Sequence, residues 1–424
     1  MAEHEALLRP APPTPTLPAP TTAWMWLAAL SLALATLYAL AVVIFRLPFF
    51  AGALPQLFRT ALVLHVELAI FVFLLATMAA QWTENAVSRA NLTPPLIAAL
   101  GTTLLAVSPL AGGRPVMLDY FPIIAGNVVF TIGFCLICLG TVSAAAMTIT
   151  SPHAGETLRL SSWAVLMTVL ATLATASQNT ASIADAAWAA GHTLLFAHVI
   201  TLGREWTIHA GDCPDLASTP LRLLAFASGL MPVLALLHPP GTSGFLTLYT
   251  GSMSLLLWPP ILWLIWRLRR TPGPNTRAVG LTALPLSMTL FIVGCLLGPL
   301  IHAPTTLITA HYHATMGAVA VSRMAMVYHT QPDHDPRSAN RQLITYALGL
   351  SLLVGGLALA AIEGAPRKTA ASELIVHGPW FTIGMSISGL GGMVAMIGTV
   401  WWVFRVIVDP NFAARRSQTG VSQQ

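Results

Sequence analysis

The hydrophobic pattern of the chain is a series of long apolar runs separated by short polar segments. Each run has about the 20 residues that a helix needs to cross the hydrocarbon core of a bilayer. Glycine and proline mark the turns between runs, as in HPPGTSG. No run alternates with the period of two that a membrane β-strand shows. The pattern predicts an all-α integral membrane protein, a bundle of about twelve transmembrane helices, with spans near 22–46, 59–82, 94–112, 122–147, 161–178, 185–204, 219–239, 244–266, 279–299, 303–328, 341–362 and 377–406.

The two ends of the chain and the arginines predict the domain organisation and the orientation. Residues 1–21 are rich in Pro and Ala and carry both acids and bases, which is typical of a disordered tail. Residues 22–406 form the membrane domain, and 407–424 form a C-terminal tail. Most arginines fall in the segments on the same side as the two ends. By the positive-inside rule, both termini are cytoplasmic, in a multi-pass protein of a bacterial-type inner (plasma) membrane.

The composition indicates which surroundings the chain has. It has 424 residues, of which 55% are hydrophobic and 8% are charged, whereas soluble domains carry roughly 25% charged residues. Most of the surface therefore faces the lipid bilayer. Lysine occurs once, at Lys368. A basic groove is therefore absent, and no nucleic-acid partner is expected.

The histidines carry the candidate chemistry. Histidine within a membrane span is uncommon and usually functional. In the predicted orientation, the outer halves of four spans place five histidines in one layer, namely His65, His192, His238, His311 and His313. Such a layer predicts a site for haem and for another metal.

The most specific feature is the pair in AHYHATMG. Residues i and i+2 on a helix point about 200° apart, so His311 and His313 cannot bind the same metal. They can bind two separate centres on opposite sides of one helix, and haem iron accepts an axial imidazole. The simpler alternative is a pair of core histidines whose nitrogens are hydrogen-bonded within the protein.

Four segments resemble the heme-copper oxidase superfamily, that is, the catalytic subunit I of oxygen reductases and nitric oxide reductases. They are LHVELAIF in the second span, AAGHTLLFAH in the sixth, LALLHPPG in the seventh and LITAHYHATMGA in the tenth. The family has twelve helices, with both ends in the cytoplasm. The segment from His302 through TTLITAHYH is most similar to nitric oxide reductases.

The resemblance implies a role for each of the five histidines. His65 and His313 would be the axial ligands of a low-spin haem, and His311 the ligand of a high-spin haem, with both haems b-type. His192 and His238 would bind a second metal, copper or non-haem iron, so that the catalytic set is His192, His238 and His311. Imidazole suits either metal.

The implied activity is that of an oxidoreductase. It would reduce nitric oxide or oxygen with electrons from an external donor, namely a cytochrome c or cupredoxin-like subunit. Two departures from the family weaken the second metal site. A single histidine, His238, stands where the family has a pair. Phe196 stands four residues after His192, where the family carries a tyrosine or a glutamate. The second metal would then have two protein ligands.

Two other functions remain open. One is a non-respiratory haem and copper membrane protein resembling the NnrS family, which is linked to nitric oxide stress. The other is a transporter that uses histidines for proton coupling, although the chain lacks the paired broken helices of many transporters.

Three further charged residues within or beside the spans allow alternative interpretations. Glu67 could belong to a proton path from the outside, together with Asp185, or it could be an interfacial carboxylate that reaches water. Arg323 is expected to pair with a carbonyl group or to reach the inner interface.

Overall fold

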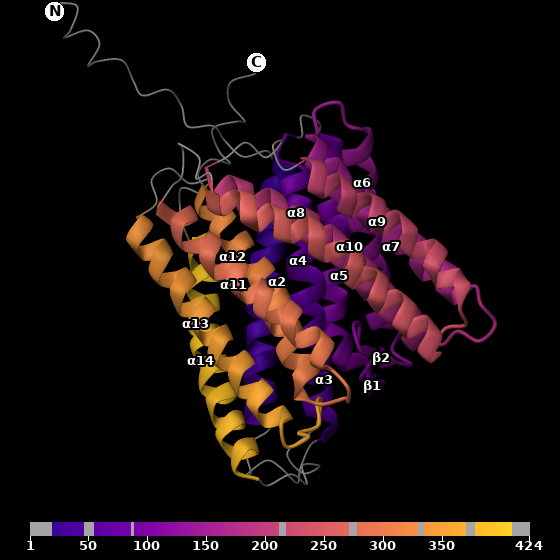
Figure 1. Cartoon of the computed structure of the whole chain (residues 1–424), viewed down its shortest axis with the longest axis vertical. Helices are drawn as coiled ribbons and strands as arrows, with labels where there is room; N and C mark the ends of the chain where they lie inside the picture. The colour runs from indigo at the N-terminus through magenta and orange to yellow at the C-terminus, as the bar shows by residue number, and fades with distance from the viewer. Residues whose placement is uncertain are drawn as a thin grey trace, which may run out of the picture.

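The computed structural model describes residues 19–45, 55–85, 89–211, 218–270, 278–329, 335–369 and 378–408. Within them, twelve long helical segments follow one another, each at one of the predicted spans (Figure 1). The first begins at Ala19 and the last ends at Val408. Most of the two predicted tails therefore lies outside the described residues.

The helices and strands have the following bounds. The second crossing is one continuous helix made of α3 (Pro55–Val66), the π-helical turn η2 (Glu67–Val72) and α4 (Phe73–Trp82). The others are α2 (Ala19–Ile44), α5 (Thr93–Val107), α6 (Val128–Thr150), α7 (Glu156–Ala176), α8 (Ile183–His209), α9 (Ser218–Leu237), α10 (Ser243–Arg270), α11 (Ala278–Leu297), α12 (Thr306–His329), α13 (Pro336–Ala361) and α14 (Pro379–Val408). Short elements are η3 (Arg89–Leu92), η4 (Ser108–Ala111), η6 (Gly298–Leu300), β1 (Arg114–Val116) and β2 (Ile123–Ala125).

Consecutive crossings alternate in direction, so an even number of them places Ala19 and Val408 at the same face of the bundle. We call this face the terminal face and the opposite one the far face. The second crossing, α8 and α12 all run from the far face to the terminal face. The connections between α5 and α6 and between α13 and α14 lie at the far face.

Eleven of the twelve helical segments in the described part of the chain are long and apolar enough to cross a membrane. The exception is α12, which has 24 residues but carries two histidines near its start and Arg323 near its end. It is nevertheless a core helix, because the residues from Gly317 to Ala325 are all buried. Its polar residues therefore face protein, as intramembrane ionisable groups usually do.

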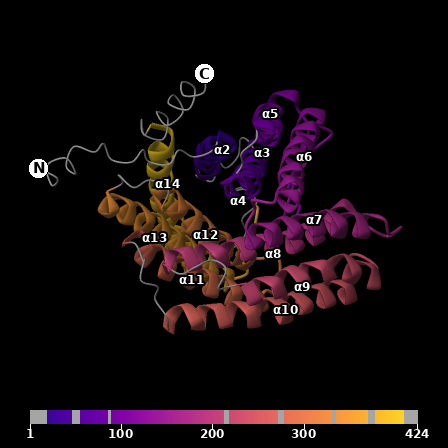
Figure 2. The same ribbon diagram turned by 90° about the horizontal axis from the view of Figure 1, so that it is seen from above.

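The bundle has a central group of helices and an outer ring. The most apolar stretch of the second crossing is 72% buried and that of α8 is 56% buried, the two largest shares among the candidate spans. Seen from above, α4, α8 and α12 lie among the other helices (Figure 2). Large apolar side chains such as Leu37, Leu255 and Phe404 are exposed on the outer helices, where lipid would cover them.

Small residues let the last two helices pack closely. A Cβ atom added at Gly349 would overlap the backbone of Ala395, and one added at Gly356 would overlap the backbone of Gly384. Backbones can approach this closely only where side chains are absent, which is a common way for membrane helices to associate. α13 and α14 thus form a tight pair at the edge of the bundle (Figure 1).

A short β-hairpin at the far face was not predicted from the sequence. β1 pairs antiparallel with β2, with Arg114 opposite Ala125 and Val116 opposite Ile123. As a consequence, the fourth span begins at Val128 rather than near residue 122. The side chain of Asn127 accepts a hydrogen bond of 2.8 Å from the backbone N–H of Phe130 and so caps α6.

Candidate functional site

Three central helices carry histidines in their far-face halves. His65 lies near the end of α3, His192 lies on α8, and His311 and His313 lie on α12. The structure therefore places four of the five predicted histidines at one depth, on the helices predicted to hold them.

The four histidines form two pairs on opposite sides of α12. The ring of His65 is close enough to that of His313 for the two to interact electrostatically. The ring of His192 has the same relationship with His311. Because His311 and His313 point about 200° apart on their helix, the backbone of α12 lies between the two pairs. Each pair consists of one imidazole on α12 and one on a neighbouring helix.

Each of these histidines has its Nδ1 atom at a backbone carbonyl group. The distances are 3.0 Å for His65 to Ala35, 2.9 Å for His192 to Trp188, 2.7 Å for His311 to Gly294 and 2.8 Å for His313 to Thr309. A carbonyl oxygen can only accept a hydrogen bond, so Nδ1 carries the proton in all four rings. The Nε2 atom then keeps its lone pair. This is the tautomer that binds a metal through Nε2, with the other nitrogen held by an outer hydrogen bond.

The sequence around His311 explains how its ring is held. Gly294 lies on α11, and a Cβ atom added there would come within 2.7 Å of the backbone nitrogen of Thr315 on α12. The two helices can therefore approach closely only because residue 294 is glycine. This approach brings the Gly294 carbonyl oxygen to the His311 ring. Gly298 leaves room on the same side, since a Cβ atom there would lie 3.2 Å from Cε1 of His311.

Aromatic side chains surround His192. The ring centroid of Trp188 lies 3.9 Å from that of His192, and the ring of Tyr120 lies 4.7 Å away, edge to face. Tyr249 is 6.4 Å away, and its hydroxyl group is 2.6 Å from that of Thr193. Tyr120 comes from the segment between β1 and β2. Sequence reasoning missed it because it lies between spans, where residue spacing does not indicate which side chain turns inward.

The GH dipeptide of the sixth span has a steric reason in the structure. A Cβ atom at Gly191 would overlap the ring of Tyr120. The absent side chain therefore lets the tyrosine ring lie against α8 beside His192.

The fifth predicted histidine lies elsewhere. His238 is exposed in the turn that follows α9. A Cβ atom added at Gly244 would be 3.1 Å from its Nδ1 atom, so the ring lies against the start of α10. The described residues contain no group of three or more His, Cys, Asp or Glu side chains arranged to hold a metal ion, and Phe196 is fully buried. A second metal would therefore lack a set of three such ligands among the described residues, and the assignment of His238 as one of its ligands stays a prediction.

Glu67 is the first residue of the π-helical turn η2 and is fully buried. The sequence allowed Glu67 to belong to a proton path or to be an interfacial carboxylate that reaches water. Its burial excludes the second interpretation. Neither of its carboxylate oxygens has a hydrogen-bond partner within the described ranges. The opposite charge that acts on it is that of Lys368. Asp185 has a structural role, since it forms a capping box with Ser182 at the start of α8.

The far-face connections close over this region. Arg367 forms an ion pair with Asp119, and the Lys368 ammonium group donates a hydrogen bond to the Leu118 carbonyl oxygen. Burial and then the neighbouring Arg367 lower the pKa of Lys368 to about 8, although Asp119 and Glu67 act in the opposite direction. The connection after α13 is thus fixed to the hairpin that presents Tyr120.

Two further histidines lie at the terminal-face ends of α8 and α12. Nδ1 of His209 is 2.9 Å from Nε2 of His329, and Nε2 of His209 is 3.1 Å from the hydroxyl oxygen of Ser322. They are far along their helices from the four histidines of the site. His334 and His377 lie outside the described residues.

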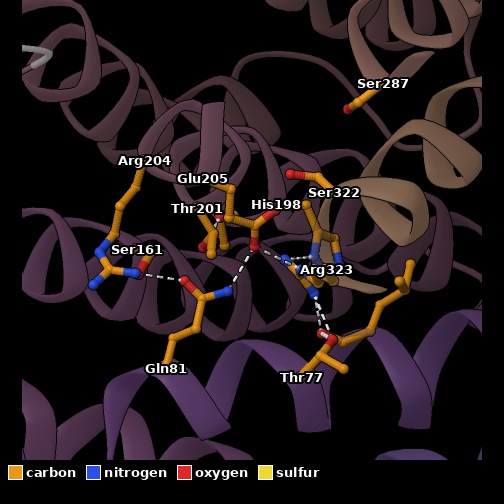
Figure 3. A network of polar contacts seen from close by, with 12 residues as sticks. Thr77, Gln81, Ser161, His198, Thr201, Arg204, Glu205, Ser287, Ser322 and Arg323 are labelled. Atoms are coloured by element: carbon orange, nitrogen blue, oxygen red, sulfur yellow. Dashed lines mark hydrogen bonds and ion pairs between the residues drawn. The ribbon is translucent and has the colours of Figure 1, made fainter. Parts of the chain in front are cut away.

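The terminal-face half of the same three helices holds a buried polar network around Arg323 and Glu205 (Figure 3). The expected carbonyl partner of Arg323 is present, since its guanidinium group donates to the Leu74 carbonyl oxygen. Sequence reasoning missed Glu205, because the sixth span was predicted to end at residue 204, whereas α8 continues to His209.

Comparisons with known proteins give the fold. No family model matches the chain. It is 24% identical to an uncharacterised protein of Rickettsia prowazekii, over 87% of this chain and 91% of that one. It is 27% identical to an uncharacterised protein of Aquifex aeolicus, over 69% of this chain and 79% of the other. Among solved structures, it is similar to a heme-copper terminal oxidase described as a dimer, with a TM-score of 0.63 and 13% identity, covering 92% of this chain and 83% of that chain. The chain therefore has the fold of heme-copper oxidase subunit I.

Proposed function

We propose that this protein is a haem-binding redox protein of the membrane, of the heme-copper oxidase type, and that it acts on nitric oxide or oxygen. The observation that carries the proposal is the arrangement of its histidines. Four imidazoles from three helices lie at one depth in two pairs, and each has its Nδ1 atom at a backbone carbonyl group.

Two haems fit this donor set. His65 and His313 would hold one haem from both sides, and His311 would hold the second from one side. A haem iron supplies one-electron transfer and, where one axial position is open, a binding position for a diatomic molecule. The protein's own contribution is to fix the ring planes through the four Nδ1 hydrogen bonds. Trp188, Tyr120 and Tyr249 surround His192 and would line the space where a diatomic molecule binds.

The histidines proposed for the second metal of the resembling family, His192 and His238, do not form such a pair. His192 offers one free Nε2 atom, and His238 is exposed at the far-face end of the bundle. The proposed chemistry therefore does not involve that metal. A working two-metal centre would need a ligand in addition to His192, because an open metal site takes about three protein ligands.

The orientation follows from the arginines, and the side of the electron donor follows from the proposed haem positions. We infer that the terminal face is cytoplasmic, because most arginines lie at that side. Both haems would then lie in the outer half of a bacterial-type inner membrane. A cytochrome c or cupredoxin-like donor on the outer side would be nearest to them.

Two alternatives make different demands on the histidines. A non-respiratory haem and copper protein of the NnrS-like type would not need the complete ligand set of an oxidase, so the missing ligands of the second metal would be no defect. A histidine-dependent transporter would need histidines that can exchange protons. The four Nδ1 atoms are instead hydrogen-bonded to backbone carbonyl groups of the membrane helices, which favours fixed ligands over mobile proton carriers.

Histidine variants of the purified protein test the proposal. Replacing His65 or His313 with Ala should remove the sharp reduced α-band of a bis-histidine haem. Replacing His311 should spare that band and remove the haem that binds carbon monoxide. His153→Ala is the matched control, since His153 is exposed and distant from these helices in the sequence. Full α-band intensity in both His65→Ala and His313→Ala would refute the assignment.

A further inference from the structure

We propose that Arg323 is a positioning residue that ties together, in the terminal-face half of the bundle, the three helices that carry the four histidines. The part of this inference that concerns haem rests on the proposed function, whereas the part that concerns the helices does not.

The guanidinium group of Arg323, on α12, donates hydrogen bonds to groups on two other helices (Figure 3). Its Nε atom donates to the carboxylate of Glu205 on α8, at 3.3 Å, and one terminal nitrogen donates to Nδ1 of His198 on α8, at 3.2 Å. The other terminal nitrogen donates to the Leu74 carbonyl oxygen and, at 3.2 Å, to the hydroxyl group of Thr77 on α4. One side chain of α12 therefore holds both α4 and α8.

Burial prevents this side chain from leaving its partners. Arg323 is 1% exposed and Glu205 is fully buried. Removing one member of a buried ion pair is strongly destabilising, because the other charge is left unpaired in a medium of low dielectric constant. The planar fork of arginine also fixes directions, which a lysine ammonium group does not.

A second set of contacts joins α4 to α8 directly. The side-chain amide of Gln81 donates to Glu205 at 2.6 Å and accepts from Arg204 at 2.9 Å. Arg204 also forms an ion pair of 2.6 Å with Glu84, beyond the end of α4. The carboxylate that holds Arg323 is therefore itself held by α4.

The hydrogen bond to His198 distinguishes this histidine from the four in the site. Arginine can only donate, so Nδ1 of His198 accepts and its proton is on Nε2. This is the opposite tautomer to that of His192 on the same helix. His198 therefore belongs to the network and not to the candidate metal site.

The network can affect the histidines because they share helices with it. Arg323 lies ten residues from His313, or about 15 Å along α12 at 1.5 Å per residue. His311 and His313 point to opposite sides, so any rotation of α12 about its axis turns both of them relative to their partners at once. A contact that fixes the rotation of α12 against α4 and α8 therefore fixes both pairs at once.

The test uses a double variant, Arg323→Met with Glu205→Gln, which removes both buried charges and leaves no unpaired ion. The matched control is Arg222→Met with Glu156→Gln. This control removes an ion pair of 2.5 Å between α9 and α7, which carry none of the four histidines. Arg323→Lys, which keeps the charge but not the fork, is the second variant should the double variant fail to accumulate.

The direct readout does not involve haem. Spin labels at Ile183, the first residue of α8, and at Ala303, three residues before α12, report the distance between the far-face ends of these helices. The labels are placed in the full chain after its four native cysteines are replaced. We expect a broadened or shifted distance distribution in the double variant and, to a smaller extent, in Arg323→Lys. The control should match the unmodified protein. Unchanged distributions in both Arg323 variants would overturn the proposal.

The second readout is the haem itself. We expect a roughly tenfold loss of haem affinity and a changed low-spin electron paramagnetic resonance signal in the double variant, as for lost outer-shell support of a metal ligand. Unchanged haem signals together with changed distances would overturn the effect on the haem ligands but not the connection between the helices. If the unmodified protein binds no haem, the proposed function fails, and the label distances still decide whether Arg323 positions the helices.

Discussion

The Nδ1 atom of His311 lies 2.7 Å from the carbonyl oxygen of Gly294. This contact links two helices, α11 and α12, beside the histidine that we propose as the ligand of the high-spin haem. A carbonyl that accepts from a ligand imidazole fixes the ring and raises its basicity toward a metal. The glycine is needed because any Cβ atom would meet the backbone of Thr315.

The first prediction concerns this glycine. Gly294→Ala should push α11 away from α12 and weaken the hydrogen bond to His311. The iron–histidine stretching frequency of the ferrous high-spin haem, measured by resonance Raman spectroscopy, should fall. Gly355→Ala on α13 is the control, since a Cβ atom there meets nothing within 4 Å. Equal frequencies in the two variants would show that the carbonyl of Gly294 does not support the ligand.

The second prediction concerns access to His192. Tyr120→Ala removes the ring that lies 4.7 Å from His192 and against Gly191. Carbon monoxide should then bind severalfold faster after flash photolysis, because one of the aromatic rings that surround His192 is removed. Tyr120→Phe keeps the ring and should bind at the unmodified rate. A rate for Tyr120→Ala equal to that of Tyr120→Phe would mean that the hairpin does not restrict access.

The third prediction concerns the second metal. His192 lies on α8, whereas His238 is exposed in the turn after α9. Copper or non-haem iron should therefore be present at well below one ion per chain after purification. Metal analysis, corrected for haem iron, measures this. His238→Ala should change the content no more than His153→Ala does. One tightly held copper ion per chain that is lost in His238→Ala would contradict this reading and favour a working oxidase.

The fourth prediction uses the single lysine of the chain. Burial, more than any other cause, lowers the pKa of Lys368 to about 8 from its ordinary value of 10.5. The neutral amine should therefore react with an acylating reagent with a midpoint near pH 8 in the folded protein, and near 10.5 after denaturation. Peptide mapping separates Lys368 from the N-terminal amine. A midpoint near 10.5 in the folded protein would show that the far-face loop does not bury this side chain.

The same shift has a consequence for stability. Between pH 8 and 10.5 the unfolded chain binds more protons at Lys368 than the folded chain does, so this residue makes stability rise with pH across that window. Lys368→Met should remove this contribution.

The fold could be predicted from the sequence because the bilayer imposes a length on each apolar run. All twelve predicted spans correspond to helices, including α12, whose apolarity alone would not identify it. The β1–β2 hairpin could not be predicted in this way, since short strands between spans have no periodicity imposed by lipid.

The depth of four histidines could also be predicted, because helix direction and residue number together fix depth. The depth of His238 could not. It falls one residue beyond the end of α9, where a small error in the boundary moves a side chain from the bundle to its surface. Partners that meet only through tertiary packing were missed, such as Tyr120 against His192 and Glu205 against Arg323.

The central claim is that this chain holds two haems through His65, His313 and His311. The most direct measurement is the absorbance spectrum of the purified protein, oxidised, reduced, and reduced with carbon monoxide, together with the haem content per chain. We predict two b-type haems per chain, one six-coordinate and unchanged by carbon monoxide, and one that binds it. A purified, folded protein without haem would contradict the account and favour a histidine-dependent transporter.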